Sequence, residues 1–299
     1  MDISTDAEKL VRQHLTAVGV NHSKASNLEE VLHLALNRGM KRVRSAPRKV
    51  HRCKNFYDKL TQLDPKMQAA ARAILEKIER GEDISGHLSK GIERAGKSDD
   101  LLADWNVHHL HISDTKAKPT DKFFARTEEV FFIVFTPTAA YCVDVHSHDE
   151  KKHPTVWTRQ LLFETIATNW PDLVEPFRAK GVVGLSHPIS DETRKTLRKN
   201  TVVSIEFNGS VYFPPGGGLS TANTPLQVGM DADRMMHWFD DIEQQLKNKT
   251  DAERQEYAAG IGVPTEKLDF AIVEDGSEHW TVIETNSKIP VIKVGHPFR

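Results

Sequence analysis

Two segments decide how the middle of the chain folds: LLADWNVHHLHIS at residues 101–113 and FFIVFTPTAAYCVDVHSHDEKKHPTVW at residues 131–157. Composition and alternation predict β-strands over residues 106–112, 130–135 and 141–148. The continuous apolar run at 130–135 is typical of a strand buried on both faces. Six of the fifteen histidines lie between His108 and His153, so we expect the chemistry of the protein in this region.

Alternation along the strands sorts the polar side chains. Residues i and i+2 of a strand share a face, so His109 and His111 point away from His108, which joins Leu110 and Ile112 on the apolar side. We therefore expect His108 to be structural. If the strands belong to one sheet, the residues predicted to cluster on a single polar face are His109, His111, Asp144, His146 and His148.

Such a cluster supports two kinds of chemistry. Because histidine titrates near neutral pH, facing histidines can move protons at an RNA 2′-hydroxyl and at the leaving oxygen, and no cofactor is needed. The catalytic candidates are then His109, His111, His146, His148 and His153, and the phosphate-binding candidates are Lys151, Lys152 and Arg159. In the alternative, a divalent metal is bound by His109, Asp144, His146 and His148, which offer imidazole and carboxylate ligands.

Composition limits the class of protein. A length of 299 residues, with 38% hydrophobic and 27% charged residues, leaves room for two or three domains with real cores. No apolar run approaches the roughly 18 residues that span a bilayer, and residues 1–10 lack a secretory signal, so we expect a cytoplasmic protein without a membrane partner. Two cysteines without a CxxC spacing exclude a cysteine zinc site.

A basic segment separates the first helices from the centre of the chain. Residues 38–54 contain eight Lys or Arg and no acid. Such a run binds phosphates, pairs with an acidic partner or serves as a solvated linker, and Pro47 within it favours a linker. The glycine-rich residues 214–218 lack the GK[ST] of a phosphate loop and are interpreted as a flexible turn.

The flanking regions give the fold class. Apolar spacing predicts two helices over residues 5–39 and a helical hairpin over 54–80, in which Asp64-Pro65 is a helix start signal. A helix is expected over 157–169. Beyond residue 200, Asn208-Gly209 indicates a hairpin, followed by a helix at 230–246 and strands at 270–273, 280–284 and 291–294.

The predicted fold is α+β, in three parts. Residues 1–52 form a helical region and basic linker, residues 53–180 a helical hairpin with an antiparallel sheet, and residues 181–299 a C-terminal α+β domain.

The central part resembles a known family. The segment KNFYDKLTQLDPKMQAAARAILEKIERGEDISGHLSKGI at residues 54–92, followed by WNVHHLHI and FFIVFTPTAAYCVDVHSHDE, is similar to the RelE/HigB superfamily of toxin endoribonucleases over residues 53–157. This resemblance implies metal-independent mRNA cleavage, free or on the ribosome, and by position it points to His146, His148, Lys152 and His153. It also implies an antitoxin-like protein partner. Histidines replace the arginine-rich sheet face of that family.

The leading hypothesis is a toxin or defence-type protein that cleaves or binds RNA. The first alternative is the metal-dependent hydrolase described above. The second is a non-enzymatic interaction or regulatory protein that uses the basic segment and the C-terminal domain.

Overall fold

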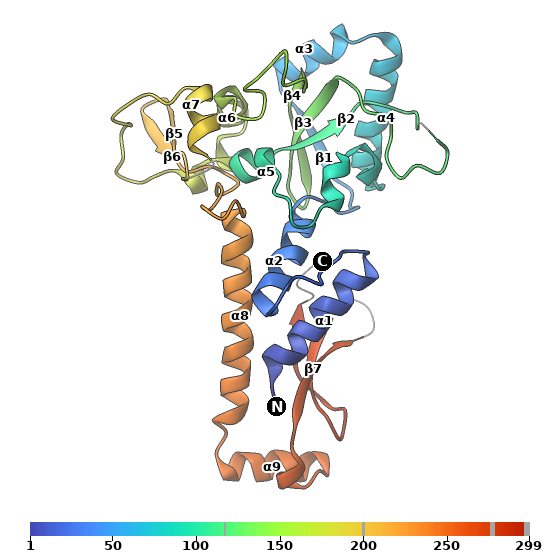
Figure 1. Ribbon diagram of the computed structural model, residues 1–299, viewed down its shortest axis with the longest axis vertical. Helices are drawn as coiled ribbons and strands as arrows, with labels where there is room; N and C mark the ends of the chain where they lie inside the picture. The colour runs from blue at the N-terminus through green and yellow to red at the C-terminus, as the bar shows by residue number, and fades with distance from the viewer. Residues whose placement is uncertain (117, 199–200, 276–278, 296–299) are drawn as a thin grey trace. The chain divides into compact units, whose positions relative to one another are not determined.

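The computed structural model describes residues 1–116, 118–198, 201–275 and 279–295 (Figure 1). Within them the fold is α+β, as predicted, with helices α1–α9 and strands β1–β9 in three sheets. The chain forms two compact units: unit 1 comprises Met1–Gly39 and Val228–Arg299, and unit 2 comprises Met40–Gln227. This division differs from the predicted one, because the first two helices pack with the C-terminal segment and residues 201–227 stay with the central region.

The predicted helical hairpin lies near the start of unit 2. It consists of α3 (Lys54–Gln62) and α4 (Pro65–Arg80). The Asp64 carboxylate accepts hydrogen bonds from the backbone N–H groups of Lys66 and Met67, and Pro65 begins the helix, where its missing N–H costs nothing. Gly81 ends α4 with a φ of 74°, a conformation that glycine adopts without strain. The start signal predicted at Asp64-Pro65 is confirmed.

The central sheet has the order β1-β4-β3-β2. Strands β2 (His108–His111), β3 (Glu129–Phe135) and β4 (Ala139–Ser147) are antiparallel, as predicted. Strand β1 (Lys49–Arg52) was not predicted; it comes from the basic segment interpreted as a linker and pairs in parallel with β4. The linker prediction was wrong there. The long side chains of Lys41 and Arg48 are buried, and a sequence run of like charges gives no sign of such burial.

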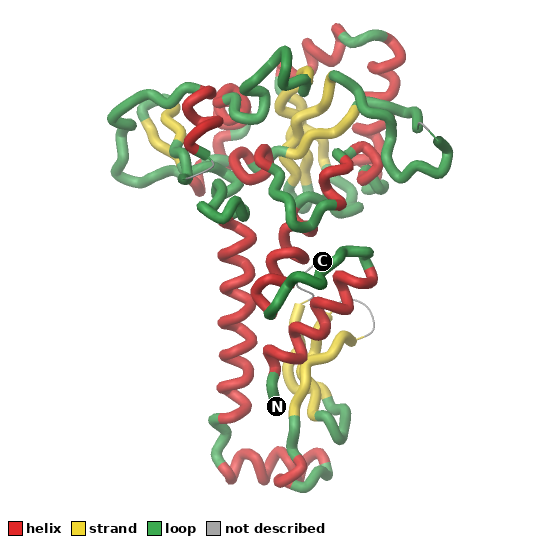
Figure 2. The backbone as a smooth tube through the Cα atoms, viewed as in Figure 1, coloured by secondary structure: helices red, strands yellow, loops and turns green. Residues whose placement is uncertain are grey.

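Both faces of this sheet are covered, so β3 is buried on both sides, as its apolar run predicted. On one face, Phe131 meets Phe56 of α3 at a ring separation of 5.1 Å. On the other, Val130 and Phe132 join a cluster with residues of α5 (Asp100–Trp105) and α6 (Gln160–Asn169). Figure 2 shows the strands of unit 2 with these helices around them.

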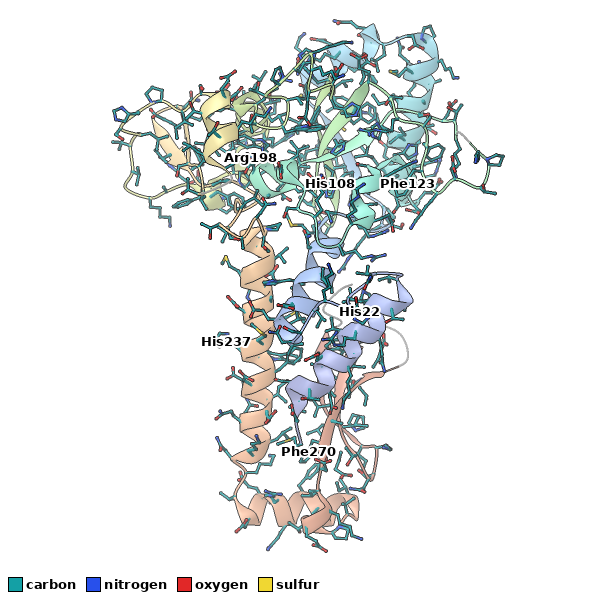
Figure 3. The ribbon with its side chains drawn as sticks, in the orientation of Figure 1. His22, His108, Phe123, Arg198, His237 and Phe270 are labelled. Carbon is teal, nitrogen blue, oxygen red and sulfur yellow. The ribbon has the colours of Figure 1, made fainter. Side chains whose placement is uncertain are left out.

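The remainder of unit 2 contains α7 (Asp191–Leu197) and the hairpin of β5 (Ile205–Phe207) and β6 (Ser210–Tyr212). Asn208 and Gly209 join the hairpin with φ values of 47° and 68°, so the predicted two-residue turn is confirmed. The segment around α7, which follows the domain boundary predicted between residues 180 and 181, contributes the buried side chains of Arg194 and Arg198. Arg198 is labelled in Figure 3. Arg198 pairs with Asp104 of α5 at 3.1 Å, which fastens this segment to unit 2.

The glycine-rich residues 214–218 are held in place by α5. The backbone N–H groups of Gly216 and Gly218 donate to the carbonyl oxygens of Asp104 and Ala103. A Cβ atom at Gly216 would lie 1.9 Å from the Leu102 carbonyl oxygen. Glycine is needed here for close backbone approach, so the interpretation as a flexible turn is replaced by a packed contact.

Unit 1 combines α1 (Ile3–Ala17), α2 (Leu28–Met40), α8 (Leu226–Lys247) and α9 (Asp251–Ile261) with strands β7 (Phe270–Asp275), β8 (His279–Glu284) and β9 (Pro290–Gly295). The strands are antiparallel in the order β7-β8-β9, and the predicted strands and helices are confirmed here. The sequence Asp275-Gly276 predicts a turn between the first two of these strands, and Gly276 lies outside the described residues. The core includes Val11, Leu32, Phe239 and Trp280.

Short 3₁₀ turns occur at Ser85–His87, Lys90–Glu93, Pro171–Leu173, Glu175–Phe177 and Thr265–Lys267. None of the helices in the described part of the chain combines the length and the apolar composition that crossing a bilayer requires.

Candidate functional site

The register of the central sheet places the predicted polar residues on shared rows. His109 and Asp144 share a row through Phe132, and His111 and His146 share the next row on that face. Strand β3 lies between their strands, and neighbouring strands are about 4.8 Å apart, so side chains two strands apart are separated by about 10 Å. The single cluster expected from the sequence is therefore divided into two groups.

The two groups are defined by their contacts. The β2 group consists of His109, His111, Arg126, His148 and Trp157. The β4 group consists of Asn55, Lys59, Asp144, His146, His153 and Arg159.

His148 belongs to the β2 group although it follows β4 in the chain. Its backbone N–H donates to the carbonyl oxygen of Glu128, just before β3, at 3.0 Å. This bond places His148 at the end of β3, where its side chain reaches the β2 group. The ring Nδ1 also donates to that carbonyl at 2.8 Å, and Nε2 accepts from Arg126 Nη2 at 3.1 Å. Since a carbonyl only accepts and a guanidinium only donates, the ring is the neutral Nδ1–H tautomer.

His111 lies inside the β2 group. Its side chain is 2% exposed, and its Nδ1 accepts from the Thr127 backbone N–H at 3.3 Å. Burial, with smaller contributions from His109 and His148, lowers the pKa of His111 to about 3. A neutral, buried ring does not suit direct contact with a substrate, so the predicted catalytic role of His111 has no support from its position.

His109 is half-buried and is therefore more accessible than His111. Its ring lies 5.1 Å from the Trp157 ring, and burial, together with His148 and Arg126, lowers its pKa.

In the β4 group, a buried carboxylate is balanced by two cations. Asp144 is 2% exposed, and its Oδ1 accepts from Lys59 Nζ at 2.6 Å and from Asn55 Nδ2 at 3.0 Å. Arg159 Nη1 lies 3.5 Å from the other carboxylate oxygen. The two cations exceed the single carboxylate by one charge, which leaves this group with an excess of positive charge.

His146 stands beside these charges with one ring nitrogen engaged. Its Nδ1 donates to the Ser147 carbonyl oxygen at 2.6 Å, which leaves Nε2 with its lone pair. The ring of His153 meets it edge-on at a centroid distance of 4.6 Å. Burial, followed by Arg159 and Lys59, lowers the pKa of His146, against the opposing effects of Ser147 and Asp144. His146 is therefore a neutral base at neutral pH.

The predicted phosphate-binding residues have different positions. Lys151 and Lys152 are exposed, and Lys152 Nζ pairs with Glu128 at 2.6 Å. Arg159 lies in the β4 group. Sequence reasoning missed Lys59, Asn55 and Arg126. Spacing of four residues does place Asn55 and Lys59 on one side of a helix, but no local signal indicates that this side reaches Asp144.

The residues of the metal hypothesis do not come together. His109 and His148 lie in the β2 group, whereas Asp144 and His146 lie in the β4 group, and the Asp144 carboxylate is taken up by Lys59 and Asn55. Over the described ranges, no group of three or more His, Cys, Asp or Glu is arranged to hold a metal ion.

Comparison of the chain with protein-family models, with curated proteins and with solved structures finds no match.

Proposed function

We propose that this protein cleaves RNA without a metal ion and that the β4 group carries out the reaction. In this reaction the phosphoryl group is transferred from the 5′-oxygen of the next nucleotide to the neighbouring ribose 2′-oxygen. The observation that carries the proposal is the pairing of His146 and His153 at 4.6 Å beside Lys59 and Arg159. This chemistry needs a base, an acid and positive charge near one phosphate, and the β4 group offers all three.

In the proposed reaction, Nε2 of His146 takes the proton of the ribose 2′-hydroxyl, and the 2′-oxygen attacks the adjacent phosphorus. The bond between phosphorus and the 5′-oxygen breaks, and His153 donates a proton to that oxygen. The products are a 2′,3′-cyclic phosphate and a 5′-hydroxyl. Arg159 and Lys59 stabilise the negative charge that gathers on the phosphate oxygens.

The pKa of His146 and the resemblance of the central segment both favour this assignment. The lowered pKa of His146 keeps its ring unprotonated, as a base must be. The resemblance of residues 53–157 to RelE/HigB toxins, which also cleave RNA without a metal, points to the same substrate class. A cytoplasmic location, a ribosome-bound substrate and an antitoxin-like partner belong to this proposal as predictions.

The test is cleavage of a defined oligoribonucleotide by the full-length protein in the presence of a chelator. We expect fragments that end in a 2′,3′-cyclic phosphate. His146→Ala should lower the cleavage rate by at least about 100-fold, since general acid–base groups typically contribute about 10²–10⁴-fold. The control is His237→Ala, on the exposed side of α8 in unit 1 (Figure 3), which should cleave normally. Undiminished cleavage by folded His146→Ala protein contradicts the proposal.

A further inference from the structure

A cavity of about 490 Å³ opens beside the β2 group within unit 2. Its size is within the range of about 300–1,000 Å³ that small-ligand sites occupy. Its walls come from the turn at Lys90–Glu93, from the start of α5 and from the β2 group, which contributes His109, Arg126, His148 and Trp157. Neither the sequence patterns nor the proposed reaction assigns a role to this cavity.

The acidic residues of the cavity wall are all engaged with the protein itself. Asp99 caps α5 by accepting from the Leu101 backbone N–H at 3.1 Å. Asp100 pairs with Arg198 at 2.9 Å. Glu150 accepts from the indole Nε1 of Trp157 at 2.6 Å. These contacts fix all three carboxylates in place, and the charge of Asp100 is offset by a cation, while Asp99 and Glu150 remain two negative charges of the wall.

The basic residues of the wall are differently placed. Five Lys or Arg line the cavity, against three acids. Lys41 is buried and donates to the carbonyl oxygens of Arg94 and Lys97, which holds the intervening loop in shape. In the described part of the chain, no carboxylate lies within ion-pair distance of Lys90, Arg94 or Arg126. The cavity therefore offers three cations to an incoming anion.

One wall of the cavity is a rigid aromatic surface. The Trp157 indole is fixed at its edge by Glu150, and the Trp157 carbonyl oxygen accepts from Trp105 Nε1 at 3.1 Å and from Arg198 Nη1 at 3.3 Å. The His109 ring lies 5.1 Å away at a tilt of 49°. Flat side chains held in this way are the surfaces on which nucleic-acid bases stack.

We propose that this cavity binds one nucleotide of an RNA strand, with its phosphate on Lys90, Arg94 and Arg126 and its base on Trp157. This inference rests on the proposed function for its choice of RNA. Because Trp157 and Arg159 are separated by one residue, as are His148 and His146, a strand that leaves the cavity passes beside the β4 group. The cavity then acts as a subsite that holds the strand and reads one base, next to the bond that is cleaved.

The experiment is isothermal titration of the full-length protein with adenosine, guanosine, cytidine and uridine monophosphates and, separately, with inorganic phosphate. We expect one nucleotide per chain. The double variant Lys90→Gln/Arg94→Gln should raise the dissociation constant at least about tenfold, because charge-assisted contacts are the strong ones. The matched control is Lys66→Gln/Arg72→Gln on the exposed side of α4, which makes the same charge change outside the cavity and should bind normally.

The variant Trp157→Leu distinguishes a cavity that binds nucleotides from one that binds any small anion. It should weaken nucleotide binding at least about tenfold, as loss of base stacking does, and leave phosphate binding unchanged. Equal effects on both ligands, or an unchanged dissociation constant in the Lys90→Gln/Arg94→Gln protein, overturn the inference. A mononucleotide has no internucleotide bond to break, so binding without any RNA cleavage refutes the proposed reaction alone, and cleavage without nucleotide binding refutes the cavity assignment alone.

Discussion

Unit 2 should lose stability steeply in mild acid, because three of its histidines are buried in the neutral form. Burial lowers the pKa of His87 and of His108 to about 4, and that of His111 to about 3. His87 stacks on Phe124 at a ring separation of 4.2 Å, and neither of its ring nitrogens makes a full hydrogen bond within the described residues. His108, labelled in Figure 3, lies on β2. Its ring is edge-on to that of Phe135.

The sign and size of the effect follow from these pKa values. A free histidine has a pKa of about 6.5, so below that pH the unfolded chain binds protons that the folded unit excludes. Stability is complete above about pH 6.5 and is lost as the pH falls toward the folded-state values. At about pH 5 each histidine costs about 2 kcal/mol, at 1.36 kcal/mol per pH unit. Three such costs sum to about 6 kcal/mol, compared with a typical total stability of about 5–15 kcal/mol.

The two cysteines make unit 2 directly observable. Cys53 and Cys142 are buried in unit 2 and are the only cysteines of the chain, so thiol labelling in urea reports on its unfolding. Labelling rates are normalised to those of the unfolded protein at the same pH. The variant is His87→Phe, which keeps a ring stacked on Phe124. Any packing cost of the larger ring is independent of pH. The stability that unit 2 loses between neutral pH and about pH 5 should, however, be smaller by about 2 kcal/mol in this variant.

The reasoning is refuted if the free energy of unfolding of unit 2 changes by less than about 1 kcal/mol between about pH 7.5 and about pH 5. It also fails if His87→Phe leaves the acid loss as large as before. His237→Phe, in unit 1, serves as the control and should leave the thiol readout unchanged.

Three other outcomes are expected. Gly216→Ala should destabilise unit 2 by more than about 3 kcal/mol in urea unfolding, because the new Cβ meets the Leu102 carbonyl at 1.9 Å. Glu284→Gln should lower the stability of unit 1 by about 1–3 kcal/mol, and the wild type should lose that stability as the pH falls below about 4.5. Burial raises the pKa of Glu284, but hydrogen bonds from Ser287 outweigh it and set the pKa at about 2. RNA cleavage should persist somewhat below about pH 6.5 and then fall as His146 is protonated, because its pKa is lowered; a rate that goes on rising as the pH falls further below about 6.5 would contradict its role as base.

Local signals predicted most helices and strands. Asp64-Pro65 and Gly81 bound α4, and Asn208-Gly209 fixes the hairpin of β5 and β6, because caps and tight turns depend on residues that are close in the chain. Strand β1 was missed, because four residues with two cations carry no clear alternation. Its pairing with β4 joins segments about 90 residues apart, and a local pattern cannot show such a contact.

The candidate site was predicted in part for the same reason. Alternation placed His109 and Asp144 on one face, and the register agrees. It could not show that β3 lies between the two strands, so the cluster of five side chains was too large. Lys59 and Arg126 were missed because a helix and a loop bring them to the site, and their charges look like ordinary surface in the sequence.

The division of unit 1 into two distant segments has a consequence for synthesis of the chain. Helices α1 and α2 leave the ribosome about 190 residues before α8 begins to supply their partners. At about 5–20 residues per second, this delay is roughly 10–40 s. During it the chain of unit 2 is synthesised, while the apolar sides of α1 and α2, with Val11 and Leu32, have no core to join. Unit 1 is therefore assembled after unit 2, and chaperones have access to α1 and α2 throughout the delay.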